Sequence, residues 1–208
     1  EWTDLTHKMG YWVDLDNPYI TYDNRYIETL WWLLKQLYSK NLLYKGYTIQ
    51  PYSPAAGTGL SSHELNQPGC YRDVKDTTVV GQFKMKNPKP EMTEWGTPYF
   101  LAWTTTPWTL IDNVATCVNP EYDYIKASSK GYNFIVGKTL ADKVLGDDYE
   151  VLETYKGVDL VGKKYCQLMP FAKVEGKAFE VLADSYVTAE DGTGIVHIAP
   201  AYGEDDSR

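Results

Sequence analysis

The stretch from Trp103 to Asn113 reads Trp-Thr-Thr-Thr-Pro-Trp-Thr-Leu-Ile-Asp-Asn. It follows an apolar run, residues 97–102, that is rich in strand-forming side chains. Pro107 has no amide hydrogen to donate, so the strand ladder is predicted to end or bend there. Threonine hydroxyls and freed backbone amides would then be presented together, which suits a pocket for a small polar ligand. The alternative interpretation is a β-branched edge strand that stops at a proline.

A second informative stretch, residues 192–206, reads Gly-Thr-Gly-Ile-Val-His-Ile-Ala-Pro-Ala-Tyr-Gly-Glu-Asp-Asp. His197 lies in an otherwise apolar strand pattern, which by itself favours a satisfied core histidine. The acidic run 204–206 follows in a loop, where carboxylates usually face solvent or cap a helix. A carboxylate turned into a pocket would instead bind an ammonium group through charge-assisted hydrogen bonds.

The peptide 103–110 resembles the threonine-rich peptide in the editing domain, or connective peptide 1, of the isoleucyl-tRNA synthetases of the class I aminoacyl-tRNA synthetase family. The valine and leucine enzymes resemble it less, because they carry Thr-Thr-Arg-Pro followed by an acidic residue. The stretch 192–206 resembles the opposite wall of the same editing pocket. The resemblance covers the whole chain, with one local departure at Ile111 and Asp112, where the family more often has proline and a small residue.

The resemblance implies roles for residues of both stretches. Asp206 would bind the α-ammonium group of a misattached amino acid, and His197 would narrow the pocket beside the scissile ester. Thr105 and Thr106 would position the ester and the terminal adenosine. The other substrate-binding positions implied are Thr104, Trp108, Thr109 and Asn113. These roles require the two stretches to meet across one small cavity.

The implied activity is hydrolysis of the ester of mischarged Val-tRNA(Ile). A site built for isoleucine cannot strongly reject valine, since the missing methylene is worth only about 1–3 kcal/mol, a limit for which the isoleucine enzyme is itself the usual example. A second cavity that excludes isoleucine could remove the error. The reactive ester needs mainly a positioned water and oxyanion stabilisation. Whether His197 carries a proton or only fills space stays open at this point.

Two other functions remain compatible with the sequence. One is a non-catalytic module that docks the aminoacylated 3′ end of tRNA, and the other is a plain structural insertion. The net charge of −8 argues against broad binding along a phosphate backbone but permits contact with one short end. The implied partners are therefore the tRNA(Ile) 3′ end carrying valine and the remainder of a synthetase chain, and not a membrane.

The 208 residues suffice for one domain, or for one domain and a small appendage. The three cysteines, Cys70, Cys117 and Cys166, are far apart and indicate neither a disulfide framework nor a metal site. No apolar run is long enough to span a membrane, and a cytoplasmic location is expected.

The fold class predicted is β-rich α+β, a small barrel-like domain with peripheral helices and an N-terminal helical stem. A helix is predicted from Thr21 or Asp23 to residues 39–41, with an apolar face packed in a core. A second, short helix is predicted at 139–145. The predicted strands are 79–86, 99–103, 114–118, 124–127, 132–136, 150–153, 179–183 and 194–198.

Three segments are expected. Residues 1–48 form the stem, and 81–208 form the editing domain, C-terminally incomplete relative to a longer parent enzyme. Residues 49–80 resemble a zinc ribbon, but Ser53 and Ala56 occupy the two cysteine positions, so no metal is expected. No cofactor is expected in this fragment. The resemblance implies that the parent enzyme uses ATP and Mg at a separate site, because His-X-Gly-His and Lys-Met-Ser-Lys-Ser are missing here.

Overall fold

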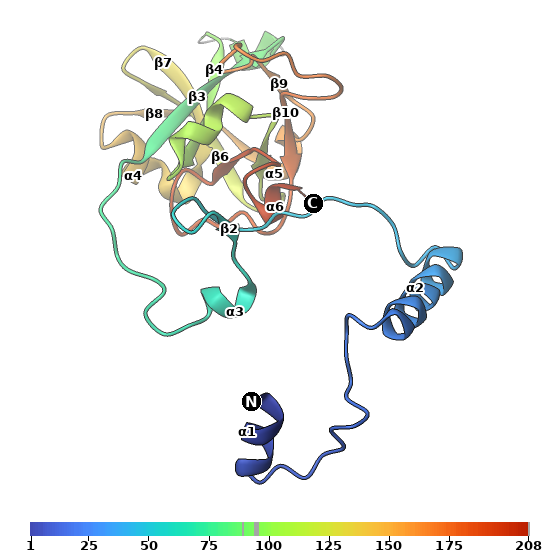
Figure 1. The fold of residues 1–208 in the computed structure, drawn as a ribbon. Coiled ribbons are helices and arrows are strands. Elements are labelled where there is room, and N and C mark those ends of the chain that lie inside the picture. The colour runs from blue at the N-terminus through green and yellow to red at the C-terminus, as the bar shows by residue number, and fades with distance from the viewer. Residues whose placement is uncertain (89, 94–95, 208) are drawn as a thin grey trace. The chain divides into compact units, whose positions relative to one another are not determined.

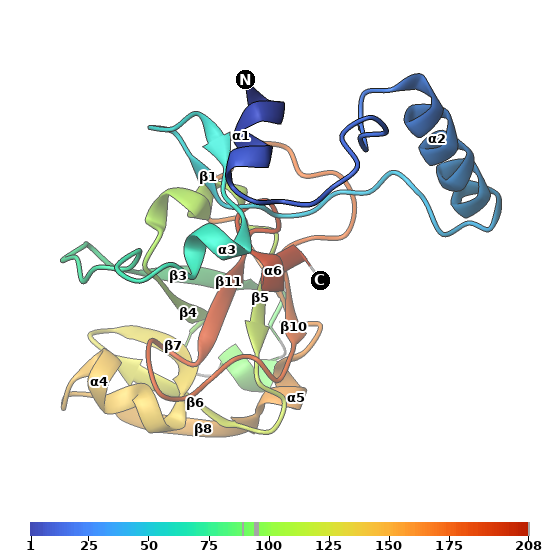
Figure 2. The ribbon, with the colours of Figure 1, turned by 60° about the horizontal axis from the view of Figure 1, so that its bottom comes forward.

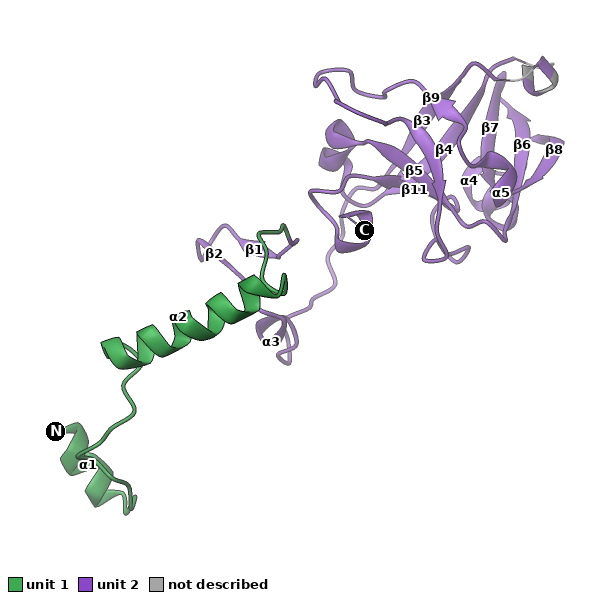
Figure 3. Cartoon of the chain, turned by 90° about the vertical axis from the view of Figure 1, so that its right-hand side faces the viewer, with its two compact units in different colours: residues 1–47 green, residues 48–208 purple. Residues whose placement is uncertain are grey.

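The computed structural model describes residues 1–88, 90–93 and 96–207 (Figure 1). The chain divides into two compact units, residues 1–47 and 48–208, which are coloured separately in Figure 3. Within the described residues, no helix combines the length and the apolar character that a membrane crossing requires.

The first unit consists of two helices, α1 (Trp2–Lys8) and α2 (Asn24–Ser39), and their connecting segments. The Asp23 side chain accepts a hydrogen bond from the Arg25 amide at 2.8 Å, which confirms the predicted helix start. The apolar face of α2 was predicted to be core, and this prediction was wrong for the structure described. None of its residues is buried, and Trp31 is 67% exposed. The first unit supplies no second layer of structure against which this face could pack.

The second unit begins with a hairpin of β1 (Tyr52–Ser53) and β2 (Thr58–Gly59), followed by α3 (Ser62–Leu65). Ser53, which stands at a cysteine position of the zinc-ribbon pattern, accepts a hydrogen bond from the Ala56 amide at 3.2 Å. The side-chain hydroxyl thus stabilises the turn directly. In the described part of the chain, no three His, Cys, Asp or Glu side chains are grouped so that they could hold a metal ion.

A mixed sheet of nine strands forms the body of the second unit, in the order β11-β5-β10-β9-β3-β4-β7-β6-β8. Most neighbours are antiparallel, and the pairs β10–β5 and β4–β7 are parallel. The strands are β3 (Val79–Lys86), β4 (Pro98–Thr104), β5 (Ala115–Val118), β6 (Asp123–Ser129), β7 (Tyr132–Gly137), β8 (Glu150–Lys156), β9 (Lys164–Tyr165), β10 (Glu180–Ala183) and β11 (Ile195–Ile198). Short helices lie between them or follow the last strand: η1 (Pro90–Thr93), η2 (Pro107–Asp112), η3 (Lys138–Leu140), α4 (Ala141–Leu145), α5 (Gly157–Leu160) and α6 (Glu204–Ser207).

The expected α+β class is confirmed, but the ladders between described strands do not close into a barrel. β11 and β8 are the edge strands of the sheet. The segment before β11 reaches across to β4 and β7 through single hydrogen bonds instead: the Trp103 amide donates to Thr193 Oγ1 at 3.2 Å, and the Gly137 amide donates to the Thr193 carbonyl at 2.8 Å. Gly192 and Gly194, with φ of 73° and 72°, turn the chain on both sides of Thr193, so no regular ladder can run there.

One buried hydroxyl links the sheet to the start of β11. Tyr124, fully buried on β6, donates a hydrogen bond to the Gly194 carbonyl at 2.7 Å and accepts one from the Asn119 amide at 2.9 Å. Burial raises its pKa to about 12, so the hydroxyl keeps its proton at neutral pH. This residue therefore holds β11, and with it His197, in place against the body of the sheet.

Replacing Tyr124 with phenylalanine is expected to lower the free energy of unfolding by about 1–3 kcal/mol, because a buried amide and a buried carbonyl lose their partner. Urea denaturation would measure this. Tyr149→Phe is the control, since it removes an exposed hydroxyl bond to Asp142 and should cost less than about 0.5 kcal/mol. Equal effects of the two substitutions would contradict the role given to Tyr124.

Candidate functional site

The threonine-rich stretch turns sharply after β4. The strand ends at Thr104, and η2 begins at Pro107, as predicted from the missing proline amide hydrogen. The Thr106 amide donates to Thr104 Oγ1 at 3.1 Å, and the Thr106 carbonyl accepts from the Thr109 amide at 3.0 Å. The side chains of this peptide thus satisfy its own backbone and hold it in a fixed shape.

The hydroxyls of this turn form a line that ends on β11. Thr106 Oγ1 lies 3.4 Å from Thr104 Oγ1 and 3.4 Å from Thr109 Oγ1. Thr109 Oγ1 lies 3.1 Å from Nε2 of His197. Thr109 and His197 are 4% and 7% exposed, so this contact is shielded from solvent. The two stretches singled out in the sequence therefore meet through a histidine and a threonine.

Asp206 completes the cluster from α6. Its Oδ2 accepts a hydrogen bond from the Ala199 amide at 2.8 Å, two residues beyond His197. Figure 2 shows α6 close to the end of β11, which lies beside β5. The Asp206 side chain is half-buried, and its negative charge acts on the His197 ring. A carboxylate, an imidazole and several hydroxyls thus lie at one place.

Other predicted site residues lie differently. Thr105 and Trp108 are exposed, Trp108 at 62%, at the surface of the threonine turn. Asn113 is buried, and both ends of its amide are bound to protein: Nδ2 donates to the Ala115 carbonyl at 2.7 Å, and Oδ1 accepts from the Tyr165 hydroxyl at 2.7 Å. In this structure Asn113 ties the turn to β9, while a direct contact with substrate remains only a prediction.

A link between the two walls was missed by sequence reasoning. The Tyr202 hydroxyl donates to Asp112 Oδ2 at 2.6 Å, joining η2 to the loop before α6. Asp112 is one of the two positions that depart from the family pattern. This departure from the family pattern was the one signal in the sequence, but it did not indicate that Tyr202 is the partner of Asp112.

Burial governs the electrostatics of His197. It disfavours the charged ring and holds the pKa of His197 below its ordinary value of 6.5, while the nearby Asp206 charge acts in the opposite direction. Because the unfolded chain binds this proton more readily, the neutral ring contributes stability that is complete above pH 6.5 and is lost as the pH falls through the lower folded-state pKa.

The free energy of unfolding of the wild type is therefore expected to fall more steeply than that of His197→Gln as the pH drops from about 7 to about 5. Glutamine cannot take up a proton, and the other titrating groups are the same in both proteins, so the difference between the two slopes reports His197. Denaturant titrations at several pH values measure both slopes. Parallel curves would show that the histidine is not a buried neutral group.

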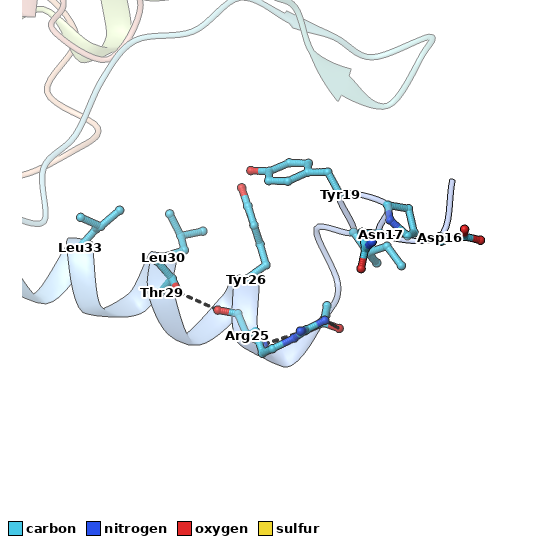
Figure 4. A pocket seen from close by; sticks show the side chains of 11 residues that line it. Asp16, Asn17, Tyr19, Arg25, Tyr26, Thr29, Leu30 and Leu33 are labelled. Atoms are coloured by element: carbon cyan, nitrogen blue, oxygen red, sulfur yellow. Dashed lines mark hydrogen bonds and ion pairs between the residues drawn. The ribbon is translucent and has the colours of Figure 1, made fainter. Parts of the chain in front are cut away.

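Two large cavities lie away from this cluster. One, of about 850 Å³, lies in the first unit around the start of α2, where the rings of Tyr19 and Tyr26 meet edge to face at 5.2 Å (Figure 4). The other, of about 670 Å³, is lined by residues that include Tyr122, Lys138 and Lys156. Neither is lined by a predicted site residue, so the candidate site is defined by its side-chain contacts.

Comparison with known families places this geometry in context. The family model described as tRNA synthetases class I (I, L, M and V) matches residues 1–189. The chain belongs to this family.

Relatives within the class I synthetases are close in sequence. The chain is 64% identical to the isoleucine–tRNA ligase of Bacteroides fragilis and 58% identical to that of Porphyromonas gingivalis. Both matches cover 100% of this chain and 20% of the relative. The chain thus spans about a fifth of the length of the curated relatives that it matches.

Solved structures share the fold of part of the chain. The crystal structure described as GlLeuRS-CP1 has a TM-score of 0.53 at 19% identity, covering 63% of this chain and 57% of that chain. The cytosolic leucyl-tRNA synthetase editing domain of P. knowlesi has a TM-score of 0.51 at 15% identity, covering 62% of this chain and 60% of that chain. At these identities the likeness concerns the fold alone.

Proposed function

We propose that the second unit is the editing domain of an isoleucine–tRNA ligase and hydrolyses the ester of mischarged Val-tRNA(Ile). The observation that carries the proposal is the contact of the threonine turn with His197, together with the bond that Asp206 makes to the Ala199 amide two residues farther along. The relatives named as isoleucine–tRNA ligases and the shared fold of editing domains support it. A cytoplasmic location goes with this function.

The chemistry assigned to the site is modest. Asp206 binds the α-ammonium group of the amino acid, since a carboxylate with one oxygen on a backbone amide still offers acceptor positions. The threonine turn holds the ester carbonyl and the terminal adenosine. Water then attacks the carbonyl carbon, a tetrahedral oxyanion forms against hydrogen-bond donors of the turn, and the ribose oxygen leaves with a proton.

Selection against isoleucine rests on size. His197 stands between the threonine turn and Asp206, where its ring takes up space beside the bound amino acid. Valine is smaller than isoleucine by one methylene, a difference that a tight pocket can read as a 10–200-fold preference, roughly. Correctly charged tRNA would thereby be spared.

The test is single-turnover deacylation with the 208-residue chain in excess over Val-tRNA(Ile) or Ile-tRNA(Ile). We expect the valine ester to disappear at least about tenfold faster than the isoleucine ester. Binding of a nonhydrolysable valyl-adenosine analogue without any deacylation would overturn the catalytic proposal and favour a module that docks the tRNA 3′ end. If the chain showed neither binding of the analogue nor deacylation, the remaining interpretation would be a structural insertion.

A further inference from the structure

One hydrogen bond fixes where the proton of His197 lies. The Thr109 hydroxyl donates to the Thr106 carbonyl at 2.8 Å. A hydroxyl has a single proton, so Thr109 Oγ1 must accept in its 3.1 Å contact with Nε2 of His197. In a neutral imidazole, one nitrogen donates and the other accepts. The proton therefore lies on Nε2, and Nδ1 presents a lone pair.

The Nδ1 lone pair and a second buried polar atom share one surface. In the described part of the chain, Nδ1 of His197 and Oγ1 of Thr116 are both buried without a hydrogen-bond partner. The antiparallel register of β11 and β5 places His197 directly opposite Thr116. Directly opposed side chains project from the same face of a sheet, with their Cβ atoms about 4.5–5.5 Å apart. The Thr116 hydroxyl, which lacks an acceptor, thus faces Nδ1 of His197, which lacks a donor.

We propose that the Thr116 hydroxyl donates a hydrogen bond to Nδ1 of His197, directly or through one ordered water, and holds the ring as the neutral tautomer with its proton on Nε2. Buried polar groups in folded proteins are almost always paired, and each of these two atoms supplies what the other lacks. Burial of the ring acts in the same direction, since it lowers the pKa of His197. Asp206 is the charged group that faces the ring, and Thr109 is the polar group on its other nitrogen.

This assignment gives His197 a defined part in the proposed deacylation, on which the functional half of the inference rests. A ring with Nε2 protonated and Nδ1 engaged has no free lone pair with which to take a proton from water. His197 therefore orients the Thr109 hydroxyl and limits the size of the bound amino acid. Thr116 is a positioning residue that acts through the histidine, and not a group that contacts substrate.

The tautomer can be observed directly by ¹⁵N NMR of the imidazole rings in the 208-residue chain. The chain has three histidines, and His7 and His63 are exposed, so the His197 signals can be assigned with a His197→Gln variant. We expect a neutral ring with its proton on Nε2 at pH 7. A proton on Nδ1, or a charged ring at pH 7, would overturn the inference.

Thr116→Val and Thr116→Ser test the partner, because valine keeps the shape of threonine without its hydroxyl and serine keeps the hydroxyl. We expect Thr116→Val to shift the Nδ1 resonance and to lower the kcat for Val-tRNA(Ile) about tenfold at nearly unchanged KM, the loss of roughly one net hydrogen bond. Thr116→Ser should restore both. Cys117→Ala is the control, since this buried neighbour on β5 points to the other face of the sheet.

The outcomes separate the inference from the proposed function. An unchanged Nδ1 resonance and an unchanged kcat in Thr116→Val would show that the bond does not exist. The expected tautomer in a wild-type chain without deacylase activity would uphold the hydrogen bond and overturn the function. Deacylation by a chain whose His197 carries its proton on Nδ1 would uphold the proposed function and overturn the hydrogen bond.

Discussion

Asp206→Asn is expected to slow the deacylation of Val-tRNA(Ile) by about 100-fold, the effect of a substrate that is no longer held in its reactive position. Asparagine can still accept the 2.8 Å hydrogen bond from the Ala199 amide, so the local turn should be kept while the negative charge is removed. The loss should appear as a raised KM and a lowered kcat, because the ammonium anchor both binds and orients. Single-turnover and steady-state deacylation rates give the two values.

Asp205→Asn is the matched control, since it removes the same charge from the neighbouring exposed position of α6. Its rate should stay within about twofold of wild type, because the Asp206 carboxylate and its bond to the Ala199 amide are both kept. If Asp206→Asn deacylated Val-tRNA(Ile) at the wild-type rate and still left Ile-tRNA(Ile) intact, Asp206 would not be the anchor of the ammonium group. Asp206→Ala, which also loses the bond to Ala199, should be at least as impaired as Asp206→Asn.

Gly157→Ala is expected to produce the largest loss of stability, at least about 3 kcal/mol. A Cβ at this buried position would overlap the Asn119 carbonyl oxygen and lie 2.8 Å from the Asn119 carbonyl carbon and 3.0 Å from Pro120 Cα. These are backbone atoms and cannot rotate away. Movement of Asn119 would also disturb its amide bond to the Tyr124 hydroxyl, and so the connection to β11. Urea denaturation and the loss of deacylation would both report the change.

Gly131→Ala separates this overlap from the ordinary cost of replacing a glycine. Gly131 has a φ of 81° in the turn between β6 and β7, and a Cβ there would meet nothing within 4 Å. The substitution should cost only roughly 1–2 kcal/mol, the penalty for a side chain in the left-handed region. Similar losses for the two variants would mean that the backbone around Gly157 moves aside.

Much of the local structure could be predicted from short-range patterns. β3 has the predicted bounds of 79–86, and Asp23 caps α2 as expected. β9 was missed because two residues are too few to show a periodic pattern. The apolar face of α2 was predicted to be buried, and this prediction was wrong, because an apolar pattern does not by itself supply a surface that covers it.

The candidate site was predicted as a set of residues, and its inner contacts were not. The Thr109–His197 bond joins positions 88 apart in the chain, and nothing local to either residue indicates it. Thr116 carried no signal at all, since a threonine in a strand is ordinary until the register places it opposite a histidine with an unpaired nitrogen. The amide of Asn113 is held on both sides by protein atoms, and its contact with substrate stays a prediction.

The sequence by itself determined where most strands and turns lie, because hydrophobic alternation, proline and capping residues act over a few neighbouring positions, while the candidate site residues were implied by the resemblance to a family. Only the tertiary structure decided that the sheet stays open, that the two walls meet through a histidine, and that a threonine lies opposite this histidine on the neighbouring strand. Those features depend on strand register and on the geometry of hydrogen bonds between distant segments, and a shift of one residue in the register would turn Thr116 or His197 to the opposite face.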